Sequence, residues 1–390
     1  MNVLITHASN RIGYAAIYSL GRKGIPVYTT DYSRFSMSFY SMHCHGYDIC
    51  PIPYKKPNDY INSLLNIIKK RKIKILLPMY DETYLISKNK NYFPSELIIP
   101  IPDYKKIMSV HNKYNLMNVC KKLCIQTPKT YLPKSIDDIE NILDKVDFPL
   151  VLKPIKGGGS FGISYVDSKE KLIKNYKKFD PKYHKNKLMI QEYIKGTTYC
   201  QALLCKNGEL RASFAYKQLR EYPLTGGTAT FRESIKEERM EKNLLKILRG
   251  LKWTGICHAD FILSDHDSKI YLIDINPRFW GSLMQAIASG VDFPYLIYKM
   301  AIEGDIKPIT NYKIGVRTLW LWGDLRILLK RIITTKKKAY AIRDFFGSFK
   351  HGLIIDDFHL KDPIPFLIYP LKKLGQIIAK RTFSPSRGGF

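Results

Sequence analysis

The sequence is short of acidic residues. Of its 390 residues, 34 are Asp or Glu and 63 are Lys or Arg, which gives a net charge of +29 at pH 7. A strongly basic surface attracts polyanions such as nucleic acids. However, the basic residues are spread in ones, twos and threes, and neither zinc-finger spacing nor an RNP-like strand accompanies them. The pattern disfavours nucleic acid as a partner and leaves a polyanionic substrate or an anionic lipid surface open.

Long hydrophobic runs are also missing. No apolar stretch reaches the ~18–20 residues of a membrane-spanning helix, and the N-terminal residues lack the pattern of a secretion signal. The seven cysteines form no CxxC pair, which indicates free thiols. His43-Cys44-His45 has no second pair of metal ligands at a usual spacing. With 45% apolar residues, we expect a globular, cytoplasmic protein of two or three domains.

The first 95 residues alternate short apolar runs with helical patterns. This alternation predicts a parallel sheet with helical crossovers. The turn at residues 7–13 lacks the paired glycines of a dinucleotide site. Asp81 and Glu82 follow a predicted strand, where either ligand binding or a helix N-cap would suit them. Residues 1–95 are therefore interpreted as a Rossmann-like domain that does not bind NAD. The expected elements are strands at 2–6, 27–31 and 73–78 and helices at 13–21 and 57–71.

A glycine-rich turn lies between two predicted strands, 148–154 and 163–166. Lys153 stands near the end of the first strand, and four glycines lie within residues 157–162. Glycine permits the backbone angles with which N–H groups wrap phosphate oxygens. A flexible hairpin tip is the alternative explanation, and the glycine run alone does not decide between the two.

A second predicted hairpin, formed by residues 255–263 and 270–278, carries paired polar groups. Asp274 and Asn276 lie two residues apart on one strand, so they share a face of the sheet. Asp260 can lie opposite them on the partner strand. Two carboxylates and an amide suit Mg²⁺, and the neighbouring Arg278 suits a phosphoryl group. Ordinary surface acids would not explain polar residues inside so apolar a run.

The order of these motifs resembles the ATP-grasp superfamily, closest in style to carboxylate–amine ligases and carbamoyl-phosphate-synthase-like proteins. The resemblance covers about residues 100–305. It implies a two-lobed ATP-grasp fold (α+β) at 96–305 with a lid lobe at about 125–195, preceded by the Rossmann-like domain at 1–95. The remaining residues, 306–390, fit the resemblance least and are expected to form a basic, helical C-terminal extension. The motifs are His111-Asn112-Lys113, residues 151–154, the glycine-rich turn, residues 191–194, Ala259-Asp260-Phe261 and residues 274–278.

The resemblance also implies roles for individual residues. Lys113 and Lys153 would contact ATP phosphates, and Mg²⁺ or Mn²⁺ would bind Asp260, Asp274 and Asn276. Arg278 would hold the phosphate or the reaction intermediate. The phosphate lid would comprise Gly157, Gly158, Gly159, Ser160 and Gly162, and the adenine hinge Gln191, Glu192 and the backbone of Ile194.

Two departures from the family pattern stand out. The segment after the hinge, Gly196-Thr197-Thr198-Tyr199, lacks the acidic residue that binds ribose in many members, so only Thr198 is available there. Both carboxylate metal positions are Asp, where Glu is frequent. Between the hinge and the hairpin, Lys217, Arg220 and Arg232 could contact phosphate or a substrate carboxylate, or could belong to a charged edge strand. Trp280 and Gly281 are expected in the wall of the acceptor pocket.

The implied activity is an ATP-dependent ligase that joins a small carboxylate to an amine, with amino acids or peptides among the possible substrates. One alternative is a carbamoyl-phosphate-synthase-like enzyme that phosphorylates a carboxylate or carbamate. The other is a non-catalytic nucleotide-binding protein. The C-terminal extension contains a basic amphipathic segment at 320–333. We expect that segment to pack on the core, with a peripheral membrane surface as the alternative.

Overall fold

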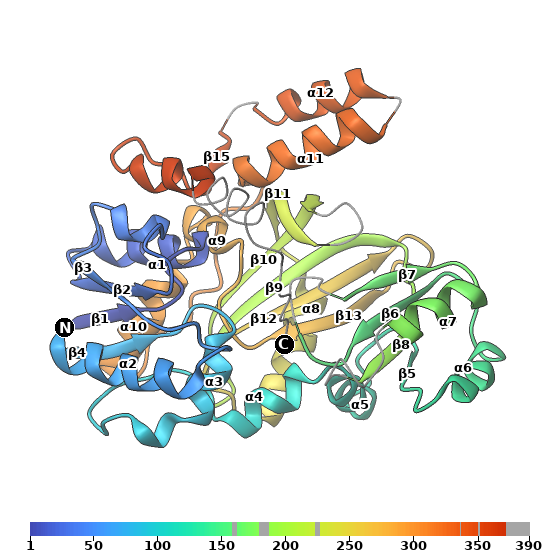
Figure 1. The fold of residues 1–390 in the computed structure, drawn as a ribbon, viewed down its shortest axis with the longest axis horizontal. Helices are drawn as coiled ribbons and strands as arrows, with labels where there is room; N and C mark the ends of the chain where they lie inside the picture. The colour runs from blue at the N-terminus through green and yellow to red at the C-terminus, as the bar shows by residue number, and fades with distance from the viewer. Residues whose placement is uncertain (158–161, 179–186, 223–226, 336, 350–351, 372–390) are drawn as a thin grey trace.

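The computed structural model describes residues 1–157, 162–178, 187–222, 227–335, 337–349 and 352–371. In this part of the chain the strands form three sheets. A four-stranded sheet from the N-terminal region and another four-stranded sheet lie on either side of a seven-stranded sheet (Figure 1). The arrangement agrees with the expected Rossmann-like domain followed by a two-lobed fold.

The N-terminal sheet is parallel, with strand order β3-β2-β1-β4. Alternate residues of β1 face opposite cores: Val3 and Ile5 pack with Ile17 of α1, whereas Leu4 packs with Leu64 of α2. The two helices therefore cover opposite faces of the sheet, as in other doubly wound folds. The elements are β1 (Asn2–Ile5), α1 (Arg11–Gly21), β2 (Val27–Asp31), the 3₁₀ helix η1 (Met37–Tyr40), β3 (Gly46–Ile49), α2 (Pro57–Lys70), β4 (Ile73–Leu77), α3 (Glu82–Lys88) and the 3₁₀ helix η2 (Lys90–Tyr92).

Two helices lead from this domain to a small antiparallel sheet of order β5-β8-β6-β7. Helices α6 and α7 cover one face of it, with Ile139 and Leu172 packed against Leu150 and Ile190. The predicted hairpin around the glycine-rich turn is present, because Leu150 pairs with Val166. The elements are α4 (Tyr104–His111), α5 (Lys113–Lys122), β5 (Thr130–Tyr131), α6 (Ile136–Leu143), β6 (Leu150–Pro154), β7 (Ser164–Val166), α7 (Lys169–Lys178) and β8 (Leu188–Glu192).

The central sheet has the order β13-β12-β9-β10-β11-β14-β15. Alternate residues of β9 enter different cores: Ala202 and Leu204 pack with the N-terminal domain, and Leu203 packs with α8. The sheet is therefore buried on both faces over much of its length. Its elements are β9 (Gly196–Lys206), β10 (Glu209–Tyr222), β11 (Thr228–Ile235), α8 (Glu238–Gly250), β12 (Gly255–Ser264), β13 (Ile270–Asn276), α9 (Leu283–Ser289), α10 (Phe293–Glu303), β14 (Arg317–Leu319) and β15 (Ile354–Ile355).

The described residues beyond 305 pack on the rest of the protein and do not form a separate unit. Strands β14 and β15 extend the central sheet, and helices α11 (Leu321–Thr334) and α12 (Lys338–Gly347) lie together above it (Figure 1). Helix α11 packs against β10 and β11, and its buried Asp324 pairs with Arg220 of β10 at 2.7 Å. Arg220 thus anchors this helix. Within the residues described, no helix combines the length and the hydrophobicity needed to cross a bilayer.

The segment after β15 returns to the N-terminal domain. The carboxylate of Asp356 pairs with Arg11 at the start of α1 at 3.0 Å. The carboxylate of Asp362 accepts hydrogen bonds from the Ser41 hydroxyl at 2.6 Å and the Met42 N–H at 3.1 Å. We call residues 354–362 the C-terminal clasp, because they connect the first domain with the central sheet.

Candidate functional site

Two carboxylates face each other on the β12–β13 hairpin. Asp260 pairs in register with Asp274, and His258 pairs with Asn276. The Asn276 amide donates a hydrogen bond to Asp260 at 3.2 Å. The strand alternation read from the sequence predicted that Asp260, Asp274 and Asn276 would converge, and the structure brings them together.

The electrostatics of this group suit a divalent cation. Burial raises the pKa of Asp260 to about 6, and the nearby carboxylate of Asp274 adds to that effect. The ammonium group of Lys113 lies 3.2 Å from the Asp274 carboxylate. Carboxylate and amide oxygens are the ligands that Mg²⁺ takes in proteins, so the residues present fit the expected ion.

The two predicted phosphate-binding lysines lie on the same cavity. Lys113 begins α5, and its ammonium donates a hydrogen bond to the Gly157 carbonyl at 2.6 Å. Lys153, on β6, is 3% exposed. Burial lowers the pKa of Lys153 to about 8, and the charge of Lys113 adds to the shift. Lys113 is paired with Asp274, and no ion pair is found for Lys153 among the described residues, so this part of the cavity can receive an anion such as a polyphosphate.

The glycine-rich turn is only partly described. Gly157 lines the cavity with φ = 116°, a conformation that favours glycine, and the neighbouring Lys156 lines it too. Gly162 also has a positive φ, of 77°, but lies outside the lining. The remaining predicted lid residues, Gly158, Gly159 and Ser160, lie outside the described residues. Their assignment to the phosphate lid stays a prediction.

The predicted adenine hinge follows β8. The Gln191 side chain is turned into the protein, where its amide donates to the Thr130 hydroxyl at 2.8 Å. The Glu192 carboxylate accepts from the Lys129 N–H at 3.2 Å. Neither residue lines the cavity, and Ile194 does not line it either, whereas Thr198 does. The apolar surface of this part comes from residues that the sequence analysis did not single out, among them Ile163, Ile262 and Ile273.

Arg278 is held rigidly at the cavity. It donates to the Asp81 carboxylate at 2.9 Å and lies over the Tyr80 ring, 4.1 Å from its centroid. Burial works against the charged guanidinium, yet the Asp81 carboxylate raises the pKa of Arg278 above its ordinary value. Asp81 provides no side-chain cap for α3, so orienting Arg278 is the role that the structure gives it.

The other two predicted substrate-binding residues do not line the cavity. Lys217 pairs with Glu233 on the neighbouring strand at 2.9 Å. Arg232 is fully buried and pairs with Asp356 of the C-terminal clasp. In both cases the charge is matched by a carboxylate within the protein, and in both cases the structure places the residue away from the cavity lining.

The cavity itself has a volume of about 490 Å³ and draws its walls from all three regions of the chain. The N-terminal domain contributes Ser9, Asn10 and Arg11, at the carboxyl end of β1, where parallel sheets bind ligands. That position is a signal from which the sequence could have identified them. Trp320 and Tyr369 come from the C-terminal region, and no local pattern marked them. The expected wall residues Trp280 and Gly281 are also present.

The cavity thus brings lysines and paired carboxylates together between the small antiparallel sheet and the central sheet. Residues 110–282 match the family model of the ATP-grasp domain. The chain is 24% identical over 304 residues to a formate-dependent phosphoribosylglycinamide formyltransferase of Bacteroides fragilis, and the match covers 71% of each protein. It is 29% identical over 225 residues to a D-alanine–D-alanine ligase of Wolbachia sp. subsp. Brugia malayi, covering 50% of this chain and 66% of the ligase.

Solved structures of the same fold extend the likeness beyond this domain. A biotin carboxylase from Campylobacter jejuni matches with a TM-score of 0.67 at 14% identity, covering 81% of this chain and 74% of that one. An N5-carboxyaminoimidazole synthetase from Staphylococcus aureus, complexed with ADP, matches with a TM-score of 0.67 at 14% identity, covering 90% and 97%. Residues 110–282 thus resemble the ATP-grasp domain, and the expected fold class and likeness to ATP-grasp ligases are confirmed.

Proposed function

We propose that this protein is an ATP- and magnesium-dependent ligase that joins a small carboxylate to an amine through an acyl phosphate. The observation that carries the proposal is the convergence of Asp260 and Asp274 with Lys113, Lys153 and Arg278 on one cavity. Carboxylates that can hold a cation, next to cations that can hold phosphate, are the parts that phosphoryl transfer needs.

The residues divide into three roles. Lys113, Lys153 and the backbone of Gly157 would bind the phosphates of ATP. Asp260, Asp274 and Asn276 would hold Mg²⁺, which would supply positive charge to neutralise the phosphates. Thr198 and the apolar residues near it would contact the nucleoside.

Arg278 would act where the carboxylate meets ATP. An oxygen of the substrate carboxylate attacks the γ-phosphorus, the bond from that phosphorus to the ADP oxygen breaks, and an acyl phosphate forms. The amine then attacks the acyl carbon, inorganic phosphate leaves, and the amine loses a proton as the amide forms. Because Asp81 and Tyr80 fix the guanidinium, Arg278 can neutralise the transferred group without rearrangement.

The amine or acid substrate would occupy the part of the cavity shared by Arg11, Trp280, Trp320 and the β1–α1 turn. An amino acid or a short peptide suits this part, because its carboxylate would find a cation in Arg11. Lys217 and Arg232 receive no substrate contact in this proposal. Arg232 acts through Asp356, the carboxylate that it shares with Arg11. All seven cysteines are free, which supports a reducing, cytoplasmic location.

The test is a screen of amino acids and short peptides for ADP release by the purified protein with Mg²⁺ and ATP. Products are identified by mass spectrometry, and hydroxylamine is added to trap an acyl phosphate as a hydroxamate. Release that depends on bicarbonate and needs no amine would favour the carboxylate-phosphorylating alternative. ATP binding without release for any pair would support a non-catalytic nucleotide-binding protein and contradict the proposal.

A further inference from the structure

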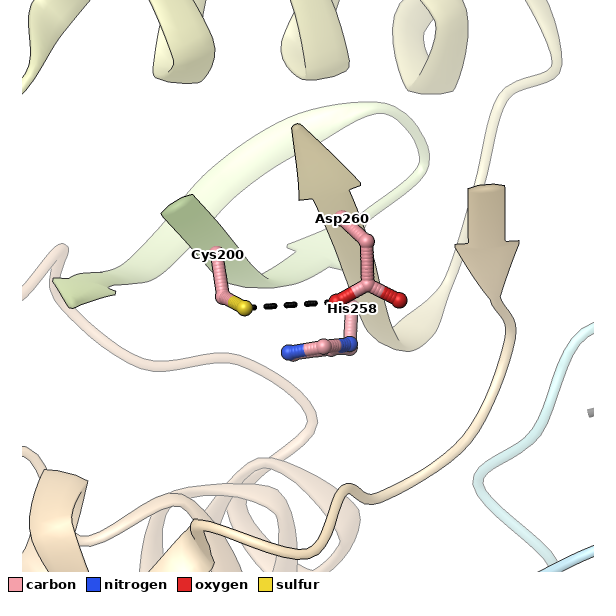
Figure 2. A group of neighbouring side chains, drawn as sticks. All are labelled: Cys200, His258 and Asp260. Carbon is pink, nitrogen blue, oxygen red and sulfur yellow. Dashed lines mark hydrogen bonds between the residues drawn. The ribbon is translucent and has the colours of Figure 1, made fainter. Parts of the chain in front are cut away.

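Three chemically different side chains meet beside the predicted magnesium ligands. Cys200 of β9 lies opposite Asp260 of β12 in register, and His258 lies two residues before Asp260 on the same face (Figure 2). One sulfur, one imidazole nitrogen and one carboxylate oxygen lie within 4.8 Å of one another. Bond lengths of about 2.0–2.3 Å place the ligand atoms of a tetrahedral zinc ion about 3.5 Å apart, so side-chain adjustments of about 1 Å would bring these three atoms to that separation.

Of these three side chains, His258 has a ring nitrogen without a partner among the described residues, and the Cys200 sulfur accepts only one weak hydrogen bond, from the Gln218 amide at 3.4 Å. The Cys200 thiol is fully buried, and it donates to the Asp260 carboxylate at 3.2 Å. His258 is 4% exposed, and its Nε2 lies 3.1 Å from the Tyr216 hydroxyl. Its Nδ1 has no hydrogen-bond partner among the described residues. An unpartnered ring nitrogen in a buried position is uncommon, because such a group loses its hydration without compensation.

Magnesium does not account for this arrangement. Mg²⁺ selects oxygen ligands, whereas thiolate and imidazole favour Zn²⁺ and related ions. If these positions only filled the core, apolar residues would suffice, as at the buried Ala202 nearby. Sulfur, nitrogen and oxygen ligands together are typical of a zinc site in which the protein supplies three ligands and the fourth position stays open. His258 and Asp260 line the cavity, so the open position would face it.

We propose that Cys200, His258 and Asp260 form a binding site for a thiophilic divalent cation such as Zn²⁺, which excludes Mg²⁺ by taking Asp260. On binding, the S–H bond of Cys200 breaks, its proton passes to solvent, and a sulfur–metal bond forms without any change of oxidation state. The site does not rest on the proposed ligase activity, because metal binding needs neither ATP nor turnover.

The experiment uses Cd²⁺ as the probe, because a cadmium–thiolate bond gives a charge-transfer band in the ultraviolet. The full chain carries Cys124→Ser, which removes the exposed thiol. We expect one equivalent of Cd²⁺ to produce the band and Cys200→Ser to abolish it. Cys257→Ser is the matched control, since Cys257 is equally buried but packs in the opposite core. This control variant should keep the full band.

Two further measurements do not depend on how well Cys200→Ser folds. A large excess of Mg²⁺ should raise the apparent dissociation constant for Cd²⁺ at least ~10-fold, because the two ions share Asp260. X-ray absorption of the zinc-loaded Cys124→Ser protein should show one sulfur together with nitrogen and oxygen ligands. A band that persists in Cys200→Ser, or zinc surrounded by oxygen alone, would overturn the proposal.

Discussion

At the scale of single residues, Asp274 is the position at which the metal and the phosphate site meet. It faces Asp260 across the hairpin and pairs with Lys113. We expect Asp274→Asn to lower ADP formation by roughly 100-fold or more, because a metal ligand loses its charge. The free energy of unfolding should change little, since the substitution also relieves the repulsion on Asp260. Coupled ADP assays and urea titrations measure the two effects.

The matched control for this variant is Asp265→Asn. Asp265 is an exposed carboxylate in the turn of the same hairpin, and no ion pair is found for it in the described part of the chain. Its substitution should leave ADP formation within about 2-fold of the original rate, because surface changes of this kind have small effects. An equal loss of activity in both variants would contradict the assigned role of Asp274.

The sequence predicted correctly which side chains meet when the alternation of a single hairpin decides the matter. Asp260, Asp274 and Asn276 belong to one hairpin, so a local pattern places them. Arg232 was predicted to contact substrate, but its partner Asp356 lies 124 residues further along the chain. Local sequence cannot show whether a charged residue has such a distant partner. For the same reason it could not show that Trp320 lines the cavity.

Asp357 gives a prediction about pH. It is fully buried, and neither side-chain oxygen has a hydrogen-bond partner among the described residues. Burial raises the pKa of Asp357 to about 7, with a contribution from Asp356. A carboxyl whose pKa is higher in the folded state stabilises the protein at low pH and loses that contribution as pH rises toward 7. The contribution of Asp357 to wild-type stability should therefore decline between about pH 4 and pH 7.

Asp357→Asn should remove this dependence. At pH 8 we expect the variant to exceed the wild type by about 1–3 kcal/mol in free energy of unfolding, at 1.4 kcal/mol per pKa unit reduced for local relaxation. Below about pH 3 the pH-dependent part of the difference should vanish, because the wild-type carboxyl is then protonated in both states. Urea titrations across the pH range measure the difference, and a constant difference at every pH would refute the assignment.

At the scale of elements, the first residue of β9, Gly196, lies unusually close to the backbone of β12. A Cβ atom added at Gly196 would lie 2.0 Å from the Leu263 carbonyl oxygen on β12. The two strands would have to separate next to Thr198 and the cavity. We expect Gly196→Ala to cost about 3 kcal/mol of unfolding free energy, as for other overpacked sites. ATP affinity should fall as well, and calorimetry measures both.

Gly250→Ala provides the comparison. Gly250 ends α8, and an added Cβ would find nothing within 4 Å. Since alanine favours the helix by up to about 1 kcal/mol, this variant should be as stable as the original protein or slightly more so. If both glycine variants lost stability equally, the close approach at Leu263 would not be the cause.

The periodicity of the sequence predicted which segments are helices or strands, but it did not predict which strands join the same sheet. The β12–β13 hairpin appears where the sequence placed it. Strands β14 and β15 contain only three and two residues, too few for a hydrophobic pattern to develop. These short strands are what joins the C-terminal region to the central sheet, so its integration could not be read from the sequence.

At the scale of the whole molecule, the cavity is completed only when the two ends of the chain meet. Arg11 lies at the start of α1, 4.2 Å above the Trp320 ring and paired with Asp356. A Cβ at Gly281 would lie 2.9 Å from its guanidinium. The side chain is thus enclosed by the N-terminal domain, the ATP-grasp domain and the clasp, which makes the geometry of the acceptor region a property of the complete fold.

Asp362 carries much of this connection. Its carboxylate accepts hydrogen bonds from the Ser41 hydroxyl, the Met42 N–H and, at 3.2 Å, the Tyr14 hydroxyl. Asp362→Ala would remove this acceptor from the buried Ser41 and Tyr14 hydroxyls and from the partly buried Met42 N–H, and each loss at a buried donor costs about 1–3 kcal/mol before relaxation. We expect the free energy of unfolding to fall by about 3 kcal/mol and hydrogen exchange to rise in residues 37–42.

The consequences for activity should be asymmetric. Loosening the clasp disturbs Arg11 and the acceptor region, whereas Lys113 and Lys153 are positioned by the ATP-grasp domain itself. Asp362→Ala should therefore raise the KM for the acceptor substrate several-fold and leave ATP affinity almost unchanged. Lys361→Ala, at the exposed neighbouring position, should change neither. An equal weakening of ATP and acceptor binding would show that the clasp supports the whole cavity rather than its acceptor side.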